Sequence, residues 1–219
     1  MHFTVQNLIN IKNEIKLNLI DLDILNLPKI IAVSKTFKID KILPLIDHGH
    51  TDFGENKIQE AVDKWTEIKS NNSNIKLHMI GKLQSNKVKF AVKLFDYIHS
   101  VDSQKLAKKI ADEQKKINKR IKIFIQVNIG NEDQKSGIHK TELDDLILYC
   151  KKINLNVVGL MCIPPADEDS STYFKEIKLL NNSFGFTELS MGMSSDFIEA
   201  SKNSATYLRI GSKIFGERL

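Results

Sequence analysis

The chain has 219 residues, of which 42% are hydrophobic and 27% are charged, and its formal net charge is +5 at pH 7. This composition is ordinary for one folded domain with a full core, and no run approaches the ~20 apolar residues that a membrane span needs. Nucleic-acid binding is disfavoured, since the lysines are interleaved with acidic residues and only 7% of the residues are aromatic. Acidic residues at positions 14, 21 and 23 interrupt the apolar N-terminus, so no signal peptide is indicated and we expect a cytoplasmic protein.

The spacing of apolar residues predicts an N-terminal helix and then strands that alternate with helices. The first helix spans residues 4–24, because Leu8, Ile11, Ile15, Leu19 and Leu22 recur at steps of three and four. Strands are predicted over residues 30–34, 51–54, 76–80, 97–101, 121–127, 156–162, 187–191 and 206–210. The remaining helices are predicted over residues 39–48, 56–70, 85–95, 103–118, 140–152, 170–183 and 194–202.

Polar residues ahead of two of these helices are typical of N-caps. Asp102 or Ser103 is expected to cap the helix over residues 103–118, because a short side-chain oxygen can accept from the first free amides. Thr141 is expected to cap the helix over residues 140–152, where acidic residues follow it at the positive end of the helix dipole.

The alternation of strands and helices favours an α/β fold with a parallel sheet. Eight repeats fit a single closed (β/α)8 TIM barrel, and a doubly wound open sheet is the alternative. We expect residues 1–219 to form one domain, in which residues 1–29 supply an extra N-terminal helix and a lead-in. In a barrel of this kind ligands bind at the carboxyl ends of the strands, with phosphate at the loops after strands 7 and 8.

Two groups of residues that often carry redox or metal chemistry are interpreted here as structural. Cys150 ends a helical pattern and Cys162 lies in an apolar strand, so both are expected in the core of a protein from a reducing compartment. His48 and His50 flank Gly49 in a predicted turn, without the fixed helical spacing that a zinc site usually shows, so no metal site is predicted.

Lys35 is the most informative residue of the chain, because it follows the short apolar strand over residues 30–34. An amine at the end of a buried strand can be desolvated, lose its proton and become a nucleophile toward an aldehyde. The alternative is an ordinary lysine at a strand end, whose amine reaches solvent. Lys35 alone does not decide between the two.

Two downstream turns have the residue types of a phosphate site. Ser194 opens the helix predicted over residues 194–202, and the first amides of a helix bind anions, although such a serine is more often only a cap. Gly211 and Ser212 follow the last strand and can add backbone donors. Arg209 lies within that apolar strand, so it must point into a polar pocket or form a structural ion pair inside the barrel. One reactive amine and two phosphate turns suggest pyridoxal 5'-phosphate (PLP).

Seven sequence motifs follow one another from about residue 30 to the C-terminus. They are Ala32-Val33-Ser34-Lys35-Thr36, Phe53-Gly54-Glu55-Asn56, residues 78–87 (HMIGKLQSNK), Lys135-Ser136-Gly137, Gly159-Leu160-Met161, residues 189–194 (LSMGMS) and residues 209–216 (RIGSKIFG). In this order and at this spacing they resemble the pyridoxal-phosphate homeostasis protein family, which is similar in turn to the barrel domain of alanine racemase. Residues 1–29 carry no matching motif.

The resemblance implies a PLP site at the mouth of the barrel. It implies that Lys35 carries the cofactor as a Schiff base, that Ser194, Gly211 and Ser212 hold the phosphate, and that Arg209 faces the pyridine nitrogen.

Three further residues match the family with less defined roles. Asn56 and His78 match positions near the mouth of the barrel. Lys135 matches a loop over the cofactor, as a possible accessory contact, although from its own residues the stretch 131–137 is only a polar loop after strand 5.

Two functions remain open, a PLP carrier and a PLP-dependent enzyme of the alanine racemase fold that acts on amino acids. Racemisation needs acid–base groups on both faces of the substrate, and Lys35 serves only one. In alanine racemase a tyrosine from a second domain serves the other face, and we expect none here because the chain ends directly after the barrel. A cation at Arg209 would also disfavour pyridine protonation and weaken the ring as an electron sink.

We therefore expect a non-enzymatic reservoir or carrier of PLP, as the family resemblance also implies. The expected partners are PLP and PLP-dependent apoenzymes, with neither nucleic acid nor membrane, and the expected state is a monomer. A barrel enzyme acting on phosphorylated sugars is a third possibility, but we find no pair of carboxylates placed as a general acid and base.

Overall fold

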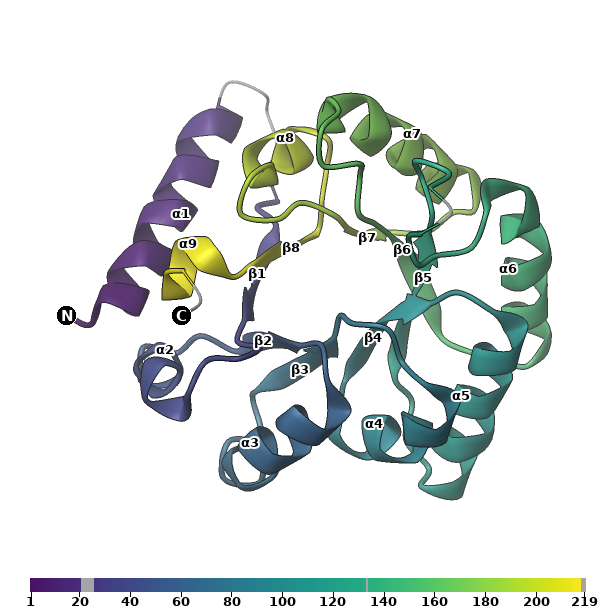
Figure 1. Ribbon diagram of the computed structural model, residues 1–219, viewed down its shortest axis with the longest axis horizontal. Coiled ribbons are helices and arrows are strands. Elements are labelled where there is room, and N and C mark those ends of the chain that lie inside the picture. Colours follow the sequence, from purple (N-terminus) through teal and green to yellow (C-terminus); the bar gives the residue numbers. More distant parts are fainter. Residues whose placement is uncertain (21–25, 133, 218–219) are drawn as a thin grey trace.

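Eight parallel strands close into a barrel, in sequence order, in the computed structural model of the chain, which describes residues 1–20, 26–132 and 134–217 (Figure 1). The strands are β1 (Lys29–Val33), β2 (Asp52–Glu55), β3 (Lys76–Met79), β4 (Tyr97–Val101), β5 (Lys122–Val127), β6 (Val157–Cys162), β7 (Glu188–Ser190) and β8 (Tyr207–Ile210). Strands β1 and β8 pair in parallel with Ile31 opposite Arg209, which closes the sheet. The predicted (β/α)8 barrel is confirmed, and the open sheet is wrong.

Helices form a ring outside the strands. They are α2 (Leu43–Asp47), α3 (Ile58–Asn71), α4 (Val88–Leu94), α5 (Gln104–Lys116), α6 (Leu143–Lys152), α7 (Ser170–Ser183) and α8 (Phe197–Lys202), and short 3-10 turns cover Ile39–Lys41, Ser85–Lys87 and Lys140–Glu142. Every predicted strand lies within one residue of the observed one at each end.

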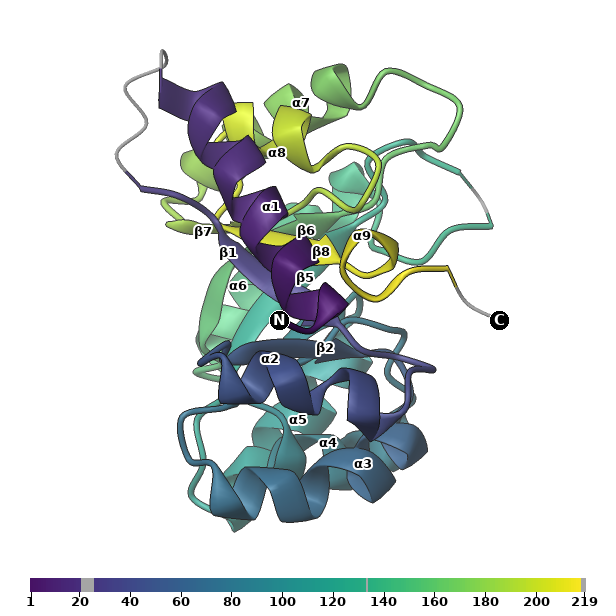
Figure 2. The ribbon, with the colours of Figure 1, turned by 90° about the vertical axis from the view of Figure 1, so that its left-hand side faces the viewer.

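The N-terminal helix α1 (Phe3–Leu19) and the short C-terminal helix α9 (Ser212–Phe215) together cover the outside of the barrel where β8 meets β1 (Figure 2). The predicted stripe of α1 is buried at Leu8, Ile11, Ile15 and Leu19. Leu22 and the predicted helical residues 21–24 lie outside the described residues. Helix α9 was not predicted, because four residues are too few to show a helical period.

The two predicted N-caps differ in outcome. Ser103 caps α5, since its hydroxyl accepts from the amide of Leu106 at 3.4 Å. The prediction for Thr141 is wrong, because a 3-10 turn occupies Lys140–Glu142 and makes Glu142 the residue that precedes α6. Ile117 falls within the helix predicted over residues 103–118, but it lies just beyond the end of α5 and is 38% exposed.

The interior of the barrel is unusually polar. TIM barrels are commonly filled with branched apolar side chains, whereas among the described residues the apolar cluster inside this barrel has five buried members, Ile31, Tyr97, Phe124, Met161 and Tyr207. The large apolar core lies instead between the strands and the helices. Buried among the five are His78, His99, Ser190 and Arg209, each at most 4% exposed. The polar residues are therefore concentrated inside the barrel.

Both cysteines are buried, as predicted. Burial raises the pKa of the Cys150 thiol to about 11 and that of Cys162 to about 12, so neither is a thiolate at neutral pH. Among the described residues no helix is long and apolar enough to cross a membrane.

Candidate functional site

A cavity of about 410 Å³ opens at the carboxyl ends of the strands, next to β1 and β8. Six of the eight site residues predicted from the sequence line this cavity, together with several apolar residues that form one wall. The predicted residues that line it are Lys35, Asn56, Ser194, Arg209, Gly211 and Ser212, and the wall includes Val33, Ile80 and Ile163. Its only ionisable lining residues, within the described parts of the chain, are Lys35 and Arg209.

Lys35 is placed by a tight turn after β1. The amide of Ser34 donates to the carbonyl of Gly54 on β2 at 3.0 Å, which extends the sheet by one residue. Thr36 has φ +68°, and its amide donates to the Glu60 carboxylate of α3 at 2.5 Å. Backbone bonds on both sides therefore fix the main chain of Lys35, whose half-buried side chain lines the cavity.

A buried carboxylate, that of Glu55, supports the turn that carries Lys35. In the sequence, Glu55 was noted only as a member of a family motif. Glu55 is fully buried and accepts from the Ser34 hydroxyl at 2.7 Å and from the Trp65 indole at 2.9 Å. Lys64 pairs with Glu55 at 3.0 Å and also donates to the Ser34 carbonyl at 2.9 Å. The available sequence signal was the position of Glu55 directly after Phe53 and Gly54 in a strand, because a buried carboxylate requires such partners.

The predicted phosphate turns lie side by side, but one differs from expectation. Ser194 lies in a turn, and α8 begins only at Phe197, so the prediction that Ser194 opens a helix is wrong. The turn forms because Asp196 accepts from the amide of Met193 at 2.6 Å and so ends the extended chain before the helix begins. Ser194 also accepts from the amide of Lys213 at 3.4 Å, which joins the turn to the segment after β8.

Gly192 permits this turn. Its φ is +87°, and a Cβ atom there would lie 2.5 Å from the Cβ of Ala200 and 2.9 Å from the Cδ2 of Leu208. Its carbonyl accepts from the amide of Arg209 at 2.9 Å. The turn after β7 and the strand that carries Arg209 are thus held together by one glycine.

Arg209 reaches the cavity from inside the barrel and is only 4% exposed. Its Nη1 donates to the Ser190 hydroxyl and its Nη2 to the Cys162 carbonyl, both at 2.8 Å. Burial lowers the pKa of Arg209, but a guanidinium stays protonated in proteins. The structural ion pair considered from the sequence is wrong for the described residues, since both partners are neutral.

The other two predicted site residues lie outside the lining of this cavity in the described structure. His78 is fully buried below it and contacts Asp52 at 3.1 Å and His99 at 3.0 Å. Lys135 lies in the loop after β5, as predicted, where its amine donates to the Pro164 carbonyl at 3.1 Å and pairs with Glu132. A contact of either residue with a cofactor stays a prediction.

Comparison with known proteins now gives the family. A family model described as the alanine racemase N-terminal domain matches residues 17–219. The pyridoxal phosphate homeostasis protein of Haemophilus influenzae is 38% identical over 205 residues, covering 88% of this chain and 86% of that protein. The protein of the same name from Synechocystis is 39% identical over 201 residues, covering 87% and 92%. The chain belongs to the pyridoxal phosphate homeostasis protein family.

Solved structures agree with this assignment. PipY of Synechococcus elongatus, determined with PLP bound, has a TM-score of 0.80 and 32% identity, covering 92% of this chain and all of PipY. A structure described as that of an unknown protein from Bifidobacterium adolescentis has a TM-score of 0.88 at 25% identity, covering 97% of this chain and 94% of that chain. Alanine racemase of Clostridium difficile, at 16% identity and a TM-score of 0.72, shows the shared fold alone; this chain covers 57% of it.

Proposed function

We propose that this protein binds pyridoxal 5'-phosphate in the cavity at the carboxyl ends of the strands and stores or delivers it without catalysing a reaction. The observation that carries the proposal is the meeting of the Lys35 amine, the buried Arg209 guanidinium and the Ser194 turn in one cavity. The relatives' shared name and the PLP bound to PipY support the same ligand.

The residues present fit this cofactor. The buried Oδ1 atom of Asn56 has no hydrogen-bond partner within the described structure, so it is an acceptor still available at the cavity wall. Gly211 lines the cavity without a side chain, and the nearest atoms to a Cβ added there would belong to Val33, at 3.5 Å. The cofactor supplies an aldehyde, with which the Lys35 amine can condense with the loss of one water.

Other residues of the cavity can bind the phosphate group and the pyridine nitrogen of the cofactor. The hydroxyls of Ser194 and Ser212 and the amide of Gly211 are donors for the phosphate group. The N–H groups of Arg209 that do not bond to Ser190 or Cys162 can donate toward an unprotonated pyridine nitrogen.

The absence of acid–base groups favours storage over catalysis. The described lining holds Lys35 and Arg209 as its only titratable residues, and Arg209 does not release its proton near neutral pH. Lys35 is then the only proton acceptor at the wall. An amino-acid racemase of the alanine racemase fold, which is the form of the alternative that the fold suggests, would need a second one on the other face of the substrate.

We further propose the oligomeric state, the location and the partners of the protein. Residues 1–219 act as one domain, as a monomer in the cytoplasm, and pass PLP to apoenzymes that require it.

Equilibrium titration with PLP, followed by absorption and then gel filtration, tests the proposal. We expect a yellow band that saturates at one PLP per chain and is lost in Lys35→Ala, while Lys38→Ala, which changes an exposed lysine three residues away, keeps it. Racemisation of amino acids by the purified protein, lost in Lys35→Ala, would instead establish the enzyme.

A further inference from the structure

We propose that a chain of buried hydrogen bonds inside the barrel positions Arg209 for the cofactor. The inference rests on the proposed function, because it requires Arg209 to face the bound PLP. Its positioning residues, in order from the opposite end of the barrel, are Asp52, His78, His99 and Ser190.

Four hydrogen bonds make up the chain. Asp52 lies 3.1 Å from the Nε2 of His78, whose Nδ1 lies 3.0 Å from the Nε2 of His99. The Nδ1 of His99 lies 2.8 Å from the Ser190 hydroxyl, which lies 2.8 Å from the Nη1 of Arg209. The residues come from β2, β3, β4, β7 and β8, so the chain crosses the barrel from the amino end of β2 to the cavity.

The donors in this chain all point one way. Arg209 has only donors, so Ser190 accepts from it, and the hydrogen of the Ser190 hydroxyl can then point toward the Nδ1 of His99. A neutral His99 then carries its proton on Nε2 and donates to the Nδ1 of His78. By the same rule His78 carries its proton on Nε2 and donates to the Asp52 carboxylate. Each group has one role, and none is left without a partner in the chain.

The surroundings hold both histidines neutral, as this direction requires. The ring of Tyr97 stacks on His78 at 4.3 Å and that of Phe124 on His99 at 4.4 Å, and both imidazoles are fully buried. Burial lowers the pKa of His78 more than the Asp52 carboxylate raises it, and burial, His78 and Arg209 together place the pKa of His99 well below its usual value. The opposite direction would need a doubly protonated His78 in this aromatic interior.

The chain solves two problems for Arg209. A buried guanidinium without an ionic partner is costly, and a polarised row of bonds links it to the distant carboxylate of Asp52. Bonds on two different nitrogens, to Ser190 and to the Cys162 carbonyl, also fix the plane of the guanidinium. Its remaining donors therefore keep one direction, toward the cavity.

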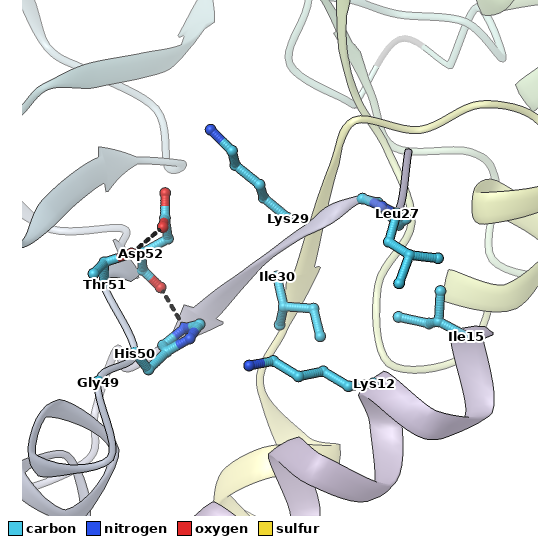
Figure 3. A pocket seen from close by; sticks show the side chains of 10 residues that line it. Lys12, Ile15, Leu27, Lys29, Ile30, Gly49, His50, Thr51 and Asp52 are labelled. Atoms are coloured by element: carbon cyan, nitrogen blue, oxygen red, sulfur yellow. Dashed lines mark hydrogen bonds between the residues drawn. The ribbon is translucent and has the colours of Figure 1, made fainter. Parts of the chain in front are cut away.

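Asp52, at the far end of the series of hydrogen bonds, lines a second cavity. This cavity, of about 380 Å³, is lined by Asp52 together with Lys12, Lys29 and His50 (Figure 3). His50 donates to the Asp52 carbonyl at 2.9 Å, and the Thr51 hydroxyl donates to the Asp52 carboxylate at 2.6 Å. A change made at this cavity should therefore reach Arg209 through the chain, although the two cavities share no lining residue among those described.

Nitrogen-15 NMR of the histidine side chains tests the donor-to-acceptor direction of these hydrogen bonds before any cofactor is added. We expect His78 and His99 to be neutral, with the proton on Nε2, at pH 7. Assignment uses single histidine substitutions. A proton on the Nδ1 of His99, or a doubly protonated His78, would overturn the proposal even if the serine and carboxylate variants described next fail to fold.

A pair of buried serines tests the link to Arg209. Ser190→Ala removes the hydroxyl between His99 and the guanidinium, and should shift the absorption maximum of the bound cofactor and weaken PLP binding about tenfold. The matched control is Ser100→Ala on β4, where the hydroxyl is equally buried but has no hydrogen-bond partner in the described structure. It should leave both properties unchanged.

A pair of carboxylates tests transmission from the far end. Asp52→Asn should shift the same absorption maximum. Glu188→Gln, which removes a carboxylate at the start of β7 that takes no part in the four hydrogen bonds, should not shift it. Equal spectra for both variants and wild type would overturn the positioning role. If the wild-type protein binds no PLP at all, the proposed function fails instead, and the NMR result still decides the direction of the chain.

Discussion

Gly192→Ala should destabilise the protein far more than a comparable glycine substitution elsewhere, because Gly192 combines a left-handed backbone with a crowded position. Gly185, just after α7, has φ +71° and nothing within 4 Å of an added Cβ, so it isolates the backbone cost. That cost is about 1–2 kcal/mol at either site. At Gly192 the added atom would also lie 2.5 Å from Ala200, and overpacking of this kind adds about 1–3 kcal/mol.

Equilibrium unfolding in urea measures the difference between these two variants. We expect Gly185→Ala to lose about 1–2 kcal/mol and Gly192→Ala about 2–5 kcal/mol, with unchanged slopes. Gly192→Ala should also bind PLP more weakly, because the Gly192 carbonyl accepts from Arg209 and the turn beyond it carries Ser194. Equal losses of stability in the two variants would refute the packing argument.

Three further predictions concern stability and reactivity. Lys64→Met leaves the Glu55 carboxylate buried without its cation and should cost about 3–5 kcal/mol in urea unfolding; an unchanged midpoint would contradict the role of this pair. Burial lowers the pKa of His50 to about 4, so the unfolded chain takes up a proton at this residue first as pH falls from about 6.5 to 4, and His50 alone should lower the free energy of unfolding by about 3 kcal/mol over that window. His50→Gln should reduce the slope of stability against pH there by close to one proton, and an identical slope would refute the assignment. Since Cys150 and Cys162 are buried with raised pKa values, iodoacetamide at pH 8 should modify them only after denaturation, as mass spectrometry would detect.

The barrel could be predicted from the sequence because strands alternate with helices eight times, although the short strands over residues 51–54 and 187–191 give a weak signal when each is taken alone. Residues 121–127, by contrast, are β-branched and alternate, and the observed strand covers Lys122–Val127. Helix starts were less accurate. Thr141 has the chemistry of a cap, but the amide of Glu142 bonds to the carbonyl of His139 and forms a 3-10 turn at that point. Competition between local turns of similar energy is not visible in a residue pattern.

The site was predictable in part. Lys35 and Arg209 stand out because each is a cation beside or within an apolar strand, and the topology brings β1 and β8 together. The supporting residues were not predictable from spacing: Lys64 reaches Glu55 from a helix, and Ser190 reaches Arg209 across the barrel. Such partners become visible only when the strands that carry them are placed in space.

The most direct test of the central claim is to trap the site of attachment. The protein is mixed with one equivalent of PLP, reduced with borohydride, digested and mapped by mass spectrometry. We predict a single pyridoxyl-phosphate adduct on Lys35, which disappears from that peptide in Lys35→Ala. Adducts spread over exposed lysines, with Lys35 unmodified, would contradict the account.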